Sequence, residues 1–229
     1  MKTGGDPMPA YQAVLFDVDG TLVHSSPGIL DTMAYTFRQM GKDVSGVDLT
    51  RYLGPPLRRT FAEHFSDPAQ VEQAVLIYRR RYATHGQFAC TLYPGAEEML
   101  RRLKQAGIGL YTATSKPREV ALPILEHLGI AGLFDEVGGA SMDASLDTKT
   151  AVMQHVLSRP ELAGRRVLMV GDRRDDMIGA ADCGLDAAAV LYGYGSREEL
   201  AAYRPCFWAE SCSSLADWLL DETTQEKGV

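Results

Sequence analysis

The stretch AVLFDVDGTLVHS, residues 13–25, carries an apolar run directly into two carboxylates. Residues 14–16 form a short strand pattern, and Asp17 and Asp19 follow at its end. Residues two apart in an extended chain project to the same side, so the two acids lie close together. Neighbouring carboxylates repel each other unless a cation or a reaction uses them. The pattern therefore predicts a buried strand that ends in a charged functional site.

The rest of the chain alternates short apolar runs with amphipathic segments. Further strands are predicted at residues 108–113, 166–171 and 187–192, with a weaker edge candidate at 206–210. Helices are predicted between them, at residues 95–106, 118–128, 149–158 and 175–183. Apolar strands that alternate with helices indicate a parallel sheet covered on both faces. We therefore predict an α/β fold whose core is a doubly wound, Rossmann-like parallel sheet.

The alternation breaks between Ser25 and Tyr93, where no convincing strand is present. Helical periodicity replaces it at residues 27–40, 56–65 and 69–85. The pattern predicts an all-helical domain at residues 25–93, inserted after the first strand. Residues 1–24 and 94–229 are expected to form the α/β core domain.

The 229 residues carry 30 acidic and 23 basic side chains, which gives a formal net charge of −7. This balance argues against a nucleic-acid polymer or an anionic membrane as partner, because both need a basic surface. The four cysteines form no Cys-x-x-Cys pair, so we expect free thiols in a reducing compartment. The sequence has no apolar run long enough for a transmembrane helix, and residues 1–10 lack the apolar region of a signal peptide. These features predict a cytoplasmic protein with a small-molecule partner and leave its oligomeric state open.

Polar side chains follow three of the predicted strands at the ends where ligands bind. Asp17 and Asp19 end the first strand, and Asp172 ends a later one. Three hydroxyl residues compete for a role at the end of another strand: Thr112, Thr114 and Ser115. The carboxyl ends of parallel strands meet in one crevice, so we expect these groups to converge with Lys149, which begins a predicted helix.

This set of groups suits phosphoryl transfer. The Asp17 carboxylate can attack phosphorus and form an aspartyl-phosphate. Asp19 can protonate the leaving alkoxide and later deprotonate the water that hydrolyses the intermediate. Mg²⁺ prefers oxygen ligands, and Asp172 and Asp176 lie one helical turn apart, so both can face the ion. Lys149 supplies a fixed positive charge, and a threonine hydroxyl with nearby backbone N–H groups can hold the phosphate oxygens.

In sequence order, these segments resemble the four motifs of the haloacid dehalogenase superfamily of phosphohydrolases. The resemblance rests on DVDGTL at residues 17–22, the strand-end threonine in TATSKP at 112–117, the downstream Lys149, and GDRRDD at 171–176. The helical insert is similar to the C1-type cap of that superfamily. Nearly the whole chain, residues 12–220, is covered by the resemblance.

The resemblance implies a role for each matching residue. Asp17 is similar to the nucleophile, and Asp19 to the general acid/base, which also gives its backbone carbonyl to Mg²⁺. Thr114 resembles the hydroxyl of the second motif, and Lys149 the lysine of the third. The metal site implied by the resemblance consists of Asp17, Asp19, Asp172 and Asp176.

Within the superfamily, the resemblance is strongest to phosphoglycolate phosphatases and related 5′-nucleotidases. It rests on the segments YPGAEEML, LYTATSKP and LYGYGSREEL, at residues 93–100, 110–117 and 191–200. His24 departs from that branch, which commonly has an acid here, at the expected hinge of the cap. The resemblance implies a Mg²⁺-dependent phosphatase that hydrolyses a small phosphate ester through an aspartyl-phosphate.

Substrate-binding residues are expected on both sides of the crevice. Thr114, Ser115 and Lys149 are expected to bind the phosphate, and Arg58, just after a Gly-Pro-Pro turn, is a candidate for facing the crevice. Lys116 competes with Lys149, and the lysine that is not used is expected to be solvated.

Other charged residues have a plainer expectation. The arginine run in YRRRY, residues 78–82, is typical of a solvated helix face. Asp175 is expected to be a surface acid near a helix N-terminus, with Arg173 and Arg174 as its partners.

Two other functions fit part of the pattern. A sugar-phosphate mutase of the β-phosphoglucomutase type shares counterparts of Asp17 and Asp19 and moves phosphate between hydroxyls of one sugar. A phospho-accepting signalling module similar to a response-regulator receiver also gathers acids, a threonine and a lysine at strand ends. The motif order disfavours the module, because its phospho-accepting aspartate lies on a middle strand and its fold has no place for the helical insert.

Overall fold

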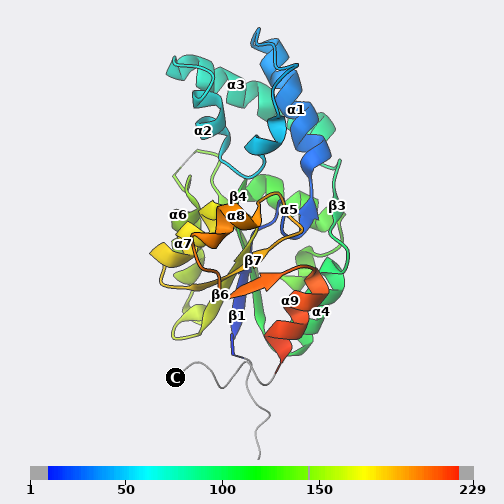
Figure 1. Cartoon of the computed structure of the whole chain (residues 1–229), viewed down its shortest axis with the longest axis vertical. Helices are drawn as coiled ribbons and strands as arrows, with labels where there is room; N and C mark the ends of the chain where they lie inside the picture. Colours follow the sequence, from blue (N-terminus) through cyan, green and yellow to red (C-terminus); the bar gives the residue numbers. More distant parts are fainter. Residues whose placement is uncertain (1–9, 144, 222–229) are drawn as a thin grey trace, which may run out of the picture.

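A computed structural model of the chain describes residues 10–143 and 145–221, so the ends of the predicted core, 1–9 and 222–229, lie outside the described residues. Within that part of the chain, six parallel strands form one sheet in the order β5-β4-β1-β6-β7-β8 (Figure 1). Their bounds are β1 Ala13–Phe16, β4 Gly109–Pro117, β5 Glu136–Ala140, β6 Val167–Gly171, β7 Asp186–Val190 and β8 Phe207–Ala209. The predicted parallel sheet is confirmed, and the weak candidate at 206–210 is its edge strand.

Strand β1 lies in the interior of the sheet, between β4 and β6. Its four residues are all buried, and alternate side chains join apolar clusters on opposite faces. Val14 and Phe16 belong to one cluster, and Ala13 and Leu15 belong to the other. The residues that follow Phe16 therefore emerge near the middle of the carboxyl edge of the sheet.

Helices cover both faces of the sheet, which confirms the doubly wound arrangement (Figure 1). Buried side chains of three helices join the cluster of Val14: α4 Ala96–Gln105, α5 Arg118–His127 and α9 Cys212–Leu220. Two helices cover the opposite face: α6 Lys149–Leu157 and α7 Arg174–Asp182. The short helix α8 Arg197–Ala201 packs beside α7. None of the helices described is long and apolar enough to cross a membrane.

The helical segment, residues 25–93, lies beyond the carboxyl edge of the sheet (Figure 1). Its helical elements are α1 Ser26–Gln39, η1 Leu49–Tyr52, α2 Leu57–Ala62, α3 Pro68–Arg81 and η2 Tyr82–Gly86. Phe37 and Phe61 are fully buried within it, with ring centroids 5.6 Å apart. This aromatic packing joins the same continuous apolar cluster as Val14 and Phe16 of β1.

Two-residue strands join the helical segment to the sheet. Strand β2 Val23–His24 pairs antiparallel with β3 Thr91–Leu92, where the chain leaves for the segment and returns from it. The expectation of no strand within residues 25–93 is therefore wrong for β3. A two-residue pairing lacks the length that gives a strand pattern in sequence.

The sequence also did not predict strand β5, and its glycines explain why. Its sequence EVGGA has two glycines in five residues, which weakens the apolar pattern of a buried strand. Both glycines lie where the chain is closely covered. A Cβ on Gly138 would lie 2.4 Å from Cγ2 of Val156 in α6 and 2.5 Å from the carbonyl oxygen of Thr112 in β4. Close packing leaves no room for side chains at these two positions. Without apolar side chains there, the sequence lacks the pattern on which a strand prediction depends.

Candidate active site

The end of β1 and the turn after it place Asp17 and Asp19. The Asp17 N–H donates to the carbonyl of Val170 in β6, at 2.9 Å, so the carboxylate leaves the sheet at its edge. Gly20 follows with a φ of +87°, a conformation that favours glycine. A Cβ there would lie 2.2 Å from Oδ2 of Asp172. The glycine therefore permits the turn and also allows Asp172 to approach it.

A buried cluster of carboxylates lies at this edge. Asp17, Asp172 and Asp176 each offer an oxygen within 4.8 Å of the others, which among the described residues makes them a candidate metal site. Asp172 and Asp176 are fully buried. Asp176 lies in the first turn of α7, one helical turn beyond Asp172, as the spacing predicts. The structure brings these three predicted metal ligands together.

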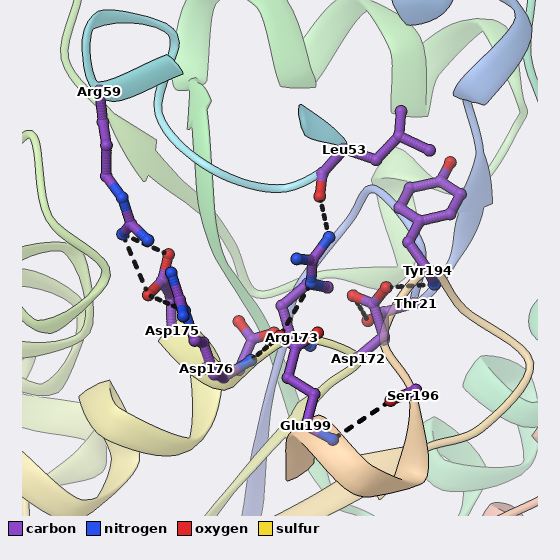
Figure 2. A network of polar contacts seen from close by, with 11 residues as sticks. Thr21, Leu53, Arg59, Asp172, Arg173, Asp175, Asp176, Tyr194, Ser196 and Glu199 are labelled. Carbon is purple, nitrogen blue, oxygen red and sulfur yellow. Dashed lines mark hydrogen bonds and ion pairs between the residues drawn. The ribbon is translucent and has the colours of Figure 1, made fainter. Parts of the chain in front are cut away.

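Hydrogen bonds fix the orientation of the two carboxylates that follow β6. Asp172 accepts hydrogen bonds from the Tyr194 N–H, at 2.7 Å, and from the Thr21 hydroxyl, at 3.3 Å (Figure 2). Asp176 accepts a hydrogen bond from the Arg173 N–H at 3.0 Å. Backbone and hydroxyl donors therefore hold both side chains without neutralising their charge.

Burial opposes the charged form of both carboxyls. Burial raises the pKa of Asp172 well above its ordinary value, and repulsion from Asp176 and Asp17 raises it further. The pKa of Asp176 rises to about 6, because burial outweighs the attraction of Lys149. A divalent cation among these oxygens offsets the repulsion, and an all-oxygen donor set is the one that Mg²⁺ prefers. The residues present therefore fit a magnesium ion.

Lys149 lies among the acids at the start of α6. Its Nζ lies 2.8 Å from Asp17 and 2.8 Å from Asp176, and it donates to the carbonyl of Ala113 at 3.0 Å. Burial alone lowers the pKa of Lys149, but the attraction of the two carboxylates outweighs burial and raises the pKa overall. The lysine is therefore a fixed positive charge beside Asp17, which is where the third motif places it.

Lys116 is buried rather than solvated, so the expectation for the competing lysine is wrong. Its Nζ lies 3.1 Å from the Asp19 carboxylate and donates to the Tyr82 hydroxyl at 2.8 Å. Burial lowers the pKa of Lys116, but Asp19 and Tyr82 together outweigh burial and raise the pKa overall. Each of the first two acids therefore has its own lysine: Lys149 for Asp17 and Lys116 for Asp19. The signal for Lys116 was its place two residues after Thr114 in TATSKP.

The hydroxyl candidates on β4 separate clearly. Thr114 is buried and lines the cavity described below, and its hydroxyl oxygen accepts a hydrogen bond from the Lys116 N–H at 3.2 Å. Ser115 lines the same cavity. The Thr112 hydroxyl instead donates to the carbonyl of Gly138 in β5, at 2.7 Å. The structure therefore places Thr114 and Ser115, rather than Thr112, at the site.

The start of the helical segment also contacts the site. The Ser25 hydroxyl donates to the Asp19 carboxylate, and the Ser25 N–H donates to the Tyr194 hydroxyl at 2.9 Å. No pattern in the sequence indicates Ser25 apart from its place beside the expected hinge. The neighbouring His24 is exposed and lies against the ring of Tyr93, with ring centroids 5.7 Å apart.

A cavity of about 190 Å³ lies between the sheet edge and the helical segment. Its wall from the α/β part, the core wall, includes Asp17, Asp19, Thr114, Ser115 and Lys116. Its wall from the helical segment, the cap wall, includes Tyr52, Leu57, Tyr78, Arg79 and Tyr82. One wall therefore carries the acids and their neighbours, and the other is mainly aromatic and apolar.

Arg58 is outside this cavity lining. Its guanidinium pairs with Glu72 at 2.6 Å and lies 3.9 Å from Asp147. Arg79, which belongs to the arginine run expected to be solvated, lines the cavity instead. Arg79 therefore takes the place in the cavity lining that was expected for Arg58. It follows the buried Tyr78 on the inner part of α3.

Arg173 links the metal candidates to the helical segment (Figure 2). Its guanidinium donates to the carbonyl of Leu53 in that segment and pairs with Glu199 at 3.0 Å. Glu199 belongs to α8, whose N-cap Ser196 accepts a hydrogen bond from the Glu199 N–H at 3.2 Å. The residue that follows Asp172 therefore ties the edge of the sheet to the helical segment.

A second contact between the two parts involves Asp175. This carboxylate pairs with Arg59 of the helical segment at 3.3 Å and more loosely with Arg174 at 3.9 Å (Figure 2). The expected pairing with Arg174 is present, whereas Arg173 is directed to Glu199 and Leu53. Asp175 is therefore a partner of the helical segment as well as a surface acid near the start of α7.

Known proteins match over most of the chain. The family model described as haloacid dehalogenase-like hydrolase matches residues 14–190. A 5′-nucleotidase of Pseudomonas aeruginosa is 34% identical over 208 residues, which cover 90% of this chain and 93% of that protein. The tyrosine-protein kinase PtkA of Mycobacterium tuberculosis is 37% identical over 196 residues, 85% of this chain and 67% of that protein. A phosphoglycolate phosphatase of Rhodospirillum rubrum is 32% identical over 222 residues, 91% of this chain and 90% of that protein.

Solved structures agree with these relatives. A predicted phosphatase from Clostridium acetobutylicum is similar with a TM-score of 0.86 and 35% sequence identity, covering 92% of this chain and 98% of that chain. The comparisons confirm the predicted superfamily and the predicted phosphatase class of enzyme, and they set aside the signalling module. The chain belongs to the haloacid dehalogenase-like hydrolase family.

Proposed function

We propose that this protein is a Mg²⁺-dependent phosphatase that hydrolyses a small phosphate ester through a phosphorylated Asp17. The observation that carries the proposal is the position of Asp17: its carboxylate lies 2.8 Å from Lys149, within 4.8 Å of two further buried acids, and at the wall of a cavity. Such a carboxylate is both accessible to a ligand and surrounded by groups that stabilise a phosphoryl group.

Asp17 and Asp19 divide the reaction between them. The Asp17 carboxylate attacks phosphorus, the ester oxygen leaves, and Asp19 gives that oxygen a proton. Asp19 then takes a proton from water, whose oxygen attacks the phosphorus of the aspartyl-phosphate and releases inorganic phosphate and Asp17. Ser25 and Lys116 hold Asp19 for both steps, since each contacts its carboxylate.

The remaining polar groups hold charge. Asp17, Asp172, Asp176 and the backbone carbonyl of Asp19 are the residues that hold Mg²⁺, which when bound neutralises charge on the phosphoryl oxygens. Thr114, Ser115 and Lys149 bind the same oxygens from the protein side, whereas Arg58 lies outside the cavity lining. Lys149 also limits repulsion between Asp17 and Asp176 before the substrate arrives.

The helical segment, residues 25–93, acts in this proposal as a cap domain on a core formed by residues 1–24 and 94–229. The placement of the cavity between the two parts supports this role, because a cap over the site keeps bulk water away during phosphoryl transfer. All four cysteines are free, which is in keeping with a cytoplasmic enzyme.

The substrate is a small phosphate ester such as phosphoglycolate or a nucleoside monophosphate. Relatives named phosphoglycolate phosphatase and 5′-nucleotidase match 90% or more of this chain. The small volume of the cavity supports a small ester rather than a polymer.

The test is phosphate release from a panel of esters: p-nitrophenyl phosphate, phosphoglycolate, nucleoside monophosphates, sugar phosphates and phosphotyrosine. Each is assayed with Mg²⁺ and with EDTA, for the wild type, Asp17→Asn and a matched control at an exposed acid, Asp43→Asn. We expect release that requires Mg²⁺, disappears in Asp17→Asn and persists in the control. Release retained by Asp17→Asn contradicts the proposal. Phosphorus NMR distinguishes a mutase, which yields an isomeric sugar phosphate in place of inorganic phosphate.

A further inference from the structure

Arg79 is a half-buried cation on the cap wall. It lies on α3 and lines the same cavity as Asp17 and Asp19. One guanidinium nitrogen donates to the carbonyl of Met142, at 3.1 Å, in the loop after β5. Its Nε is buried, and among the described residues it has no hydrogen-bond partner. The side chain is therefore held in place while part of its donor capacity is unused.

Several other arginines of the helical segment are paired with carboxylates. Arg58 pairs with Glu72, Arg59 with Asp175, and Arg81 with Asp31. Arg79 differs from them: within the described part of the chain no carboxylate lies within 4.0 Å of its guanidinium. Among the described residues, Arg38 and Arg80 also lack a carboxylate within ion-pair distance, but both are exposed and lie outside the cavity lining. Arg79 is thus the unpaired arginine that lines the cavity.

The surroundings of Arg79 leave its charge poorly compensated. Burial lowers the pKa of Arg79, and repulsion from Arg58 lowers it further. The more distant Glu72, Asp147 and Glu119 act in the opposite direction without reversing this effect. A partly buried cation without a close partner costs free energy that an anionic ligand recovers on binding. The rest of the cap wall, largely tyrosine and leucine, offers no second charge.

We propose that Arg79 binds a second anionic group, carboxylate or phosphate, on the leaving group of the substrate. The proposal rests on the proposed phosphatase function and narrows its substrate class. The phosphoryl group lies at the core wall beside Asp17, so the leaving group extends into the cavity toward the cap wall. A planar guanidinium with free donors suits a carboxylate or phosphate there. Arg79 thereby selects esters with a negatively charged leaving group over neutral ones.

The test uses three esters built on the same two-carbon scaffold. Phosphoglycolate carries a carboxylate, ethane-1,2-diol bisphosphate carries a second phosphate, and 2-hydroxyethyl phosphate carries a neutral hydroxyl. We compare kcat/KM for the wild type, Arg79→Met, the conservative Arg79→Lys, and Arg80→Met. Arg80 is the matched control, because it is the exposed neighbour on the same helix.

We expect the wild type to prefer at least one charged ester over 2-hydroxyethyl phosphate by about ten-fold or more, the usual size for a charge-assisted contact. The larger gain identifies the anion as carboxylate or phosphate. In Arg79→Met the preference falls to near one, mainly through KM, while 2-hydroxyethyl phosphate is hydrolysed within about two-fold of the wild-type rate. Arg79→Lys retains part of the preference, and Arg80→Met retains all of it.

Several results overturn the proposal. They are a wild type without preference, an unchanged preference in Arg79→Met, and an equal loss on all three esters, which indicates a structural role. Failure of the wild type to hydrolyse any ester, p-nitrophenyl phosphate included, contradicts the phosphatase function instead. In that event the melting temperature decides on Arg79: phosphoglycolate stabilises the wild type more than 2-hydroxyethyl phosphate does, and Arg79→Met loses the difference.

Discussion

The two walls of the cavity differ in how their charges are arranged. On the core wall each acid has a lysine, Asp17 with Lys149 and Asp19 with Lys116. On the cap wall the charged side chain is Arg79, without an ion-pair partner among the described residues, set among aromatic rings. The ion-paired core wall is suited to catalysing one chemical step. The apolar cap wall, with its unpaired cation, is suited to selecting among ligands. The comparison predicts that core substitutions affect all substrates alike and that cap substitutions depend on the substrate.

The largest effect is expected for Lys149→Met. Asp17 and Asp176 lose the cation that lies 2.8 Å from each, and the transferring phosphoryl group loses a positive charge. We expect kcat to fall about 10²–10³-fold, the usual cost of removing one such stabilising donor. Kinetics with p-nitrophenyl phosphate and phosphoglycolate check this, with the exposed Lys42→Met as control. A fall in kcat for only one of the two esters contradicts the prediction that core substitutions affect all substrates alike.

Asp172→Asn tests whether the acid cluster is maintained for the metal at the expense of stability. We expect the apparent affinity for Mg²⁺, read from activity, to fall about 10–100-fold or more. In EDTA at pH 8 the variant is expected to melt a few degrees higher than the wild type, because it removes a carboxyl whose ionisation is opposed by burial and by the neighbouring acids.

The pH dependence of that gain follows from the sign of the shift. The pKa of Asp172 is raised on folding, so the metal-free wild type binds more protons than its unfolded chain and loses stability as pH rises toward the raised pKa. The advantage of Asp172→Asn therefore shrinks as pH is lowered, because the wild-type carboxyl becomes increasingly protonated. Equal melting temperatures at pH 8 contradict the account of the cluster.

An intermediate effect is expected for Arg173→Met, which removes the contact with the carbonyl of Leu53 and the pair with Glu199. Both contacts hold the cap wall over the core wall, so we expect KM to rise about five-fold with little change in kcat. Steady-state kinetics beside Arg174→Met, the exposed neighbour, provide the comparison. A large fall in kcat at constant KM assigns Arg173 to the reacting groups instead.

The smallest effect is expected for Arg58→Met. Its partners Glu72 and Asp147 lie outside the cavity lining, and such partly exposed pairs contribute about 0–1 kcal/mol. We expect kcat/KM within about two-fold of the wild type for charged and neutral esters alike. This result sharpens the contrast with Arg79, whose removal is expected to change the preference among esters. A selective loss in Arg58→Met transfers that role to Arg58.

The acids and Lys149 at the sheet edge were largely predictable from sequence, and the cap wall was not. Asp17, Asp172 and Lys149 each follow or begin an element whose apolar pattern is clear, and parallel strands bring their carboxyl ends together. Ser25 and Lys116 belong to the same site but have no pattern of their own. On α3, a rotation of one residue decides whether Arg79 faces the cavity or solvent. That rotation depends on how Tyr78 packs inside the segment, which periodicity does not resolve to a single residue.

The central position of β1 has a consequence for synthesis on the ribosome. Its residues are made early, yet its partners begin at Gly109 on one side and Val167 on the other. An emerging chain therefore carries an apolar strand with both edges open until Gly109–Thr112 have been made, and with one edge open until Val167–Val170 have been made. Such edges invite aggregation. A fragment truncated before Val167 lacks one of the two neighbours of β1. Such fragments are expected to depend on chaperones even though the complete chain forms a closed sheet interior.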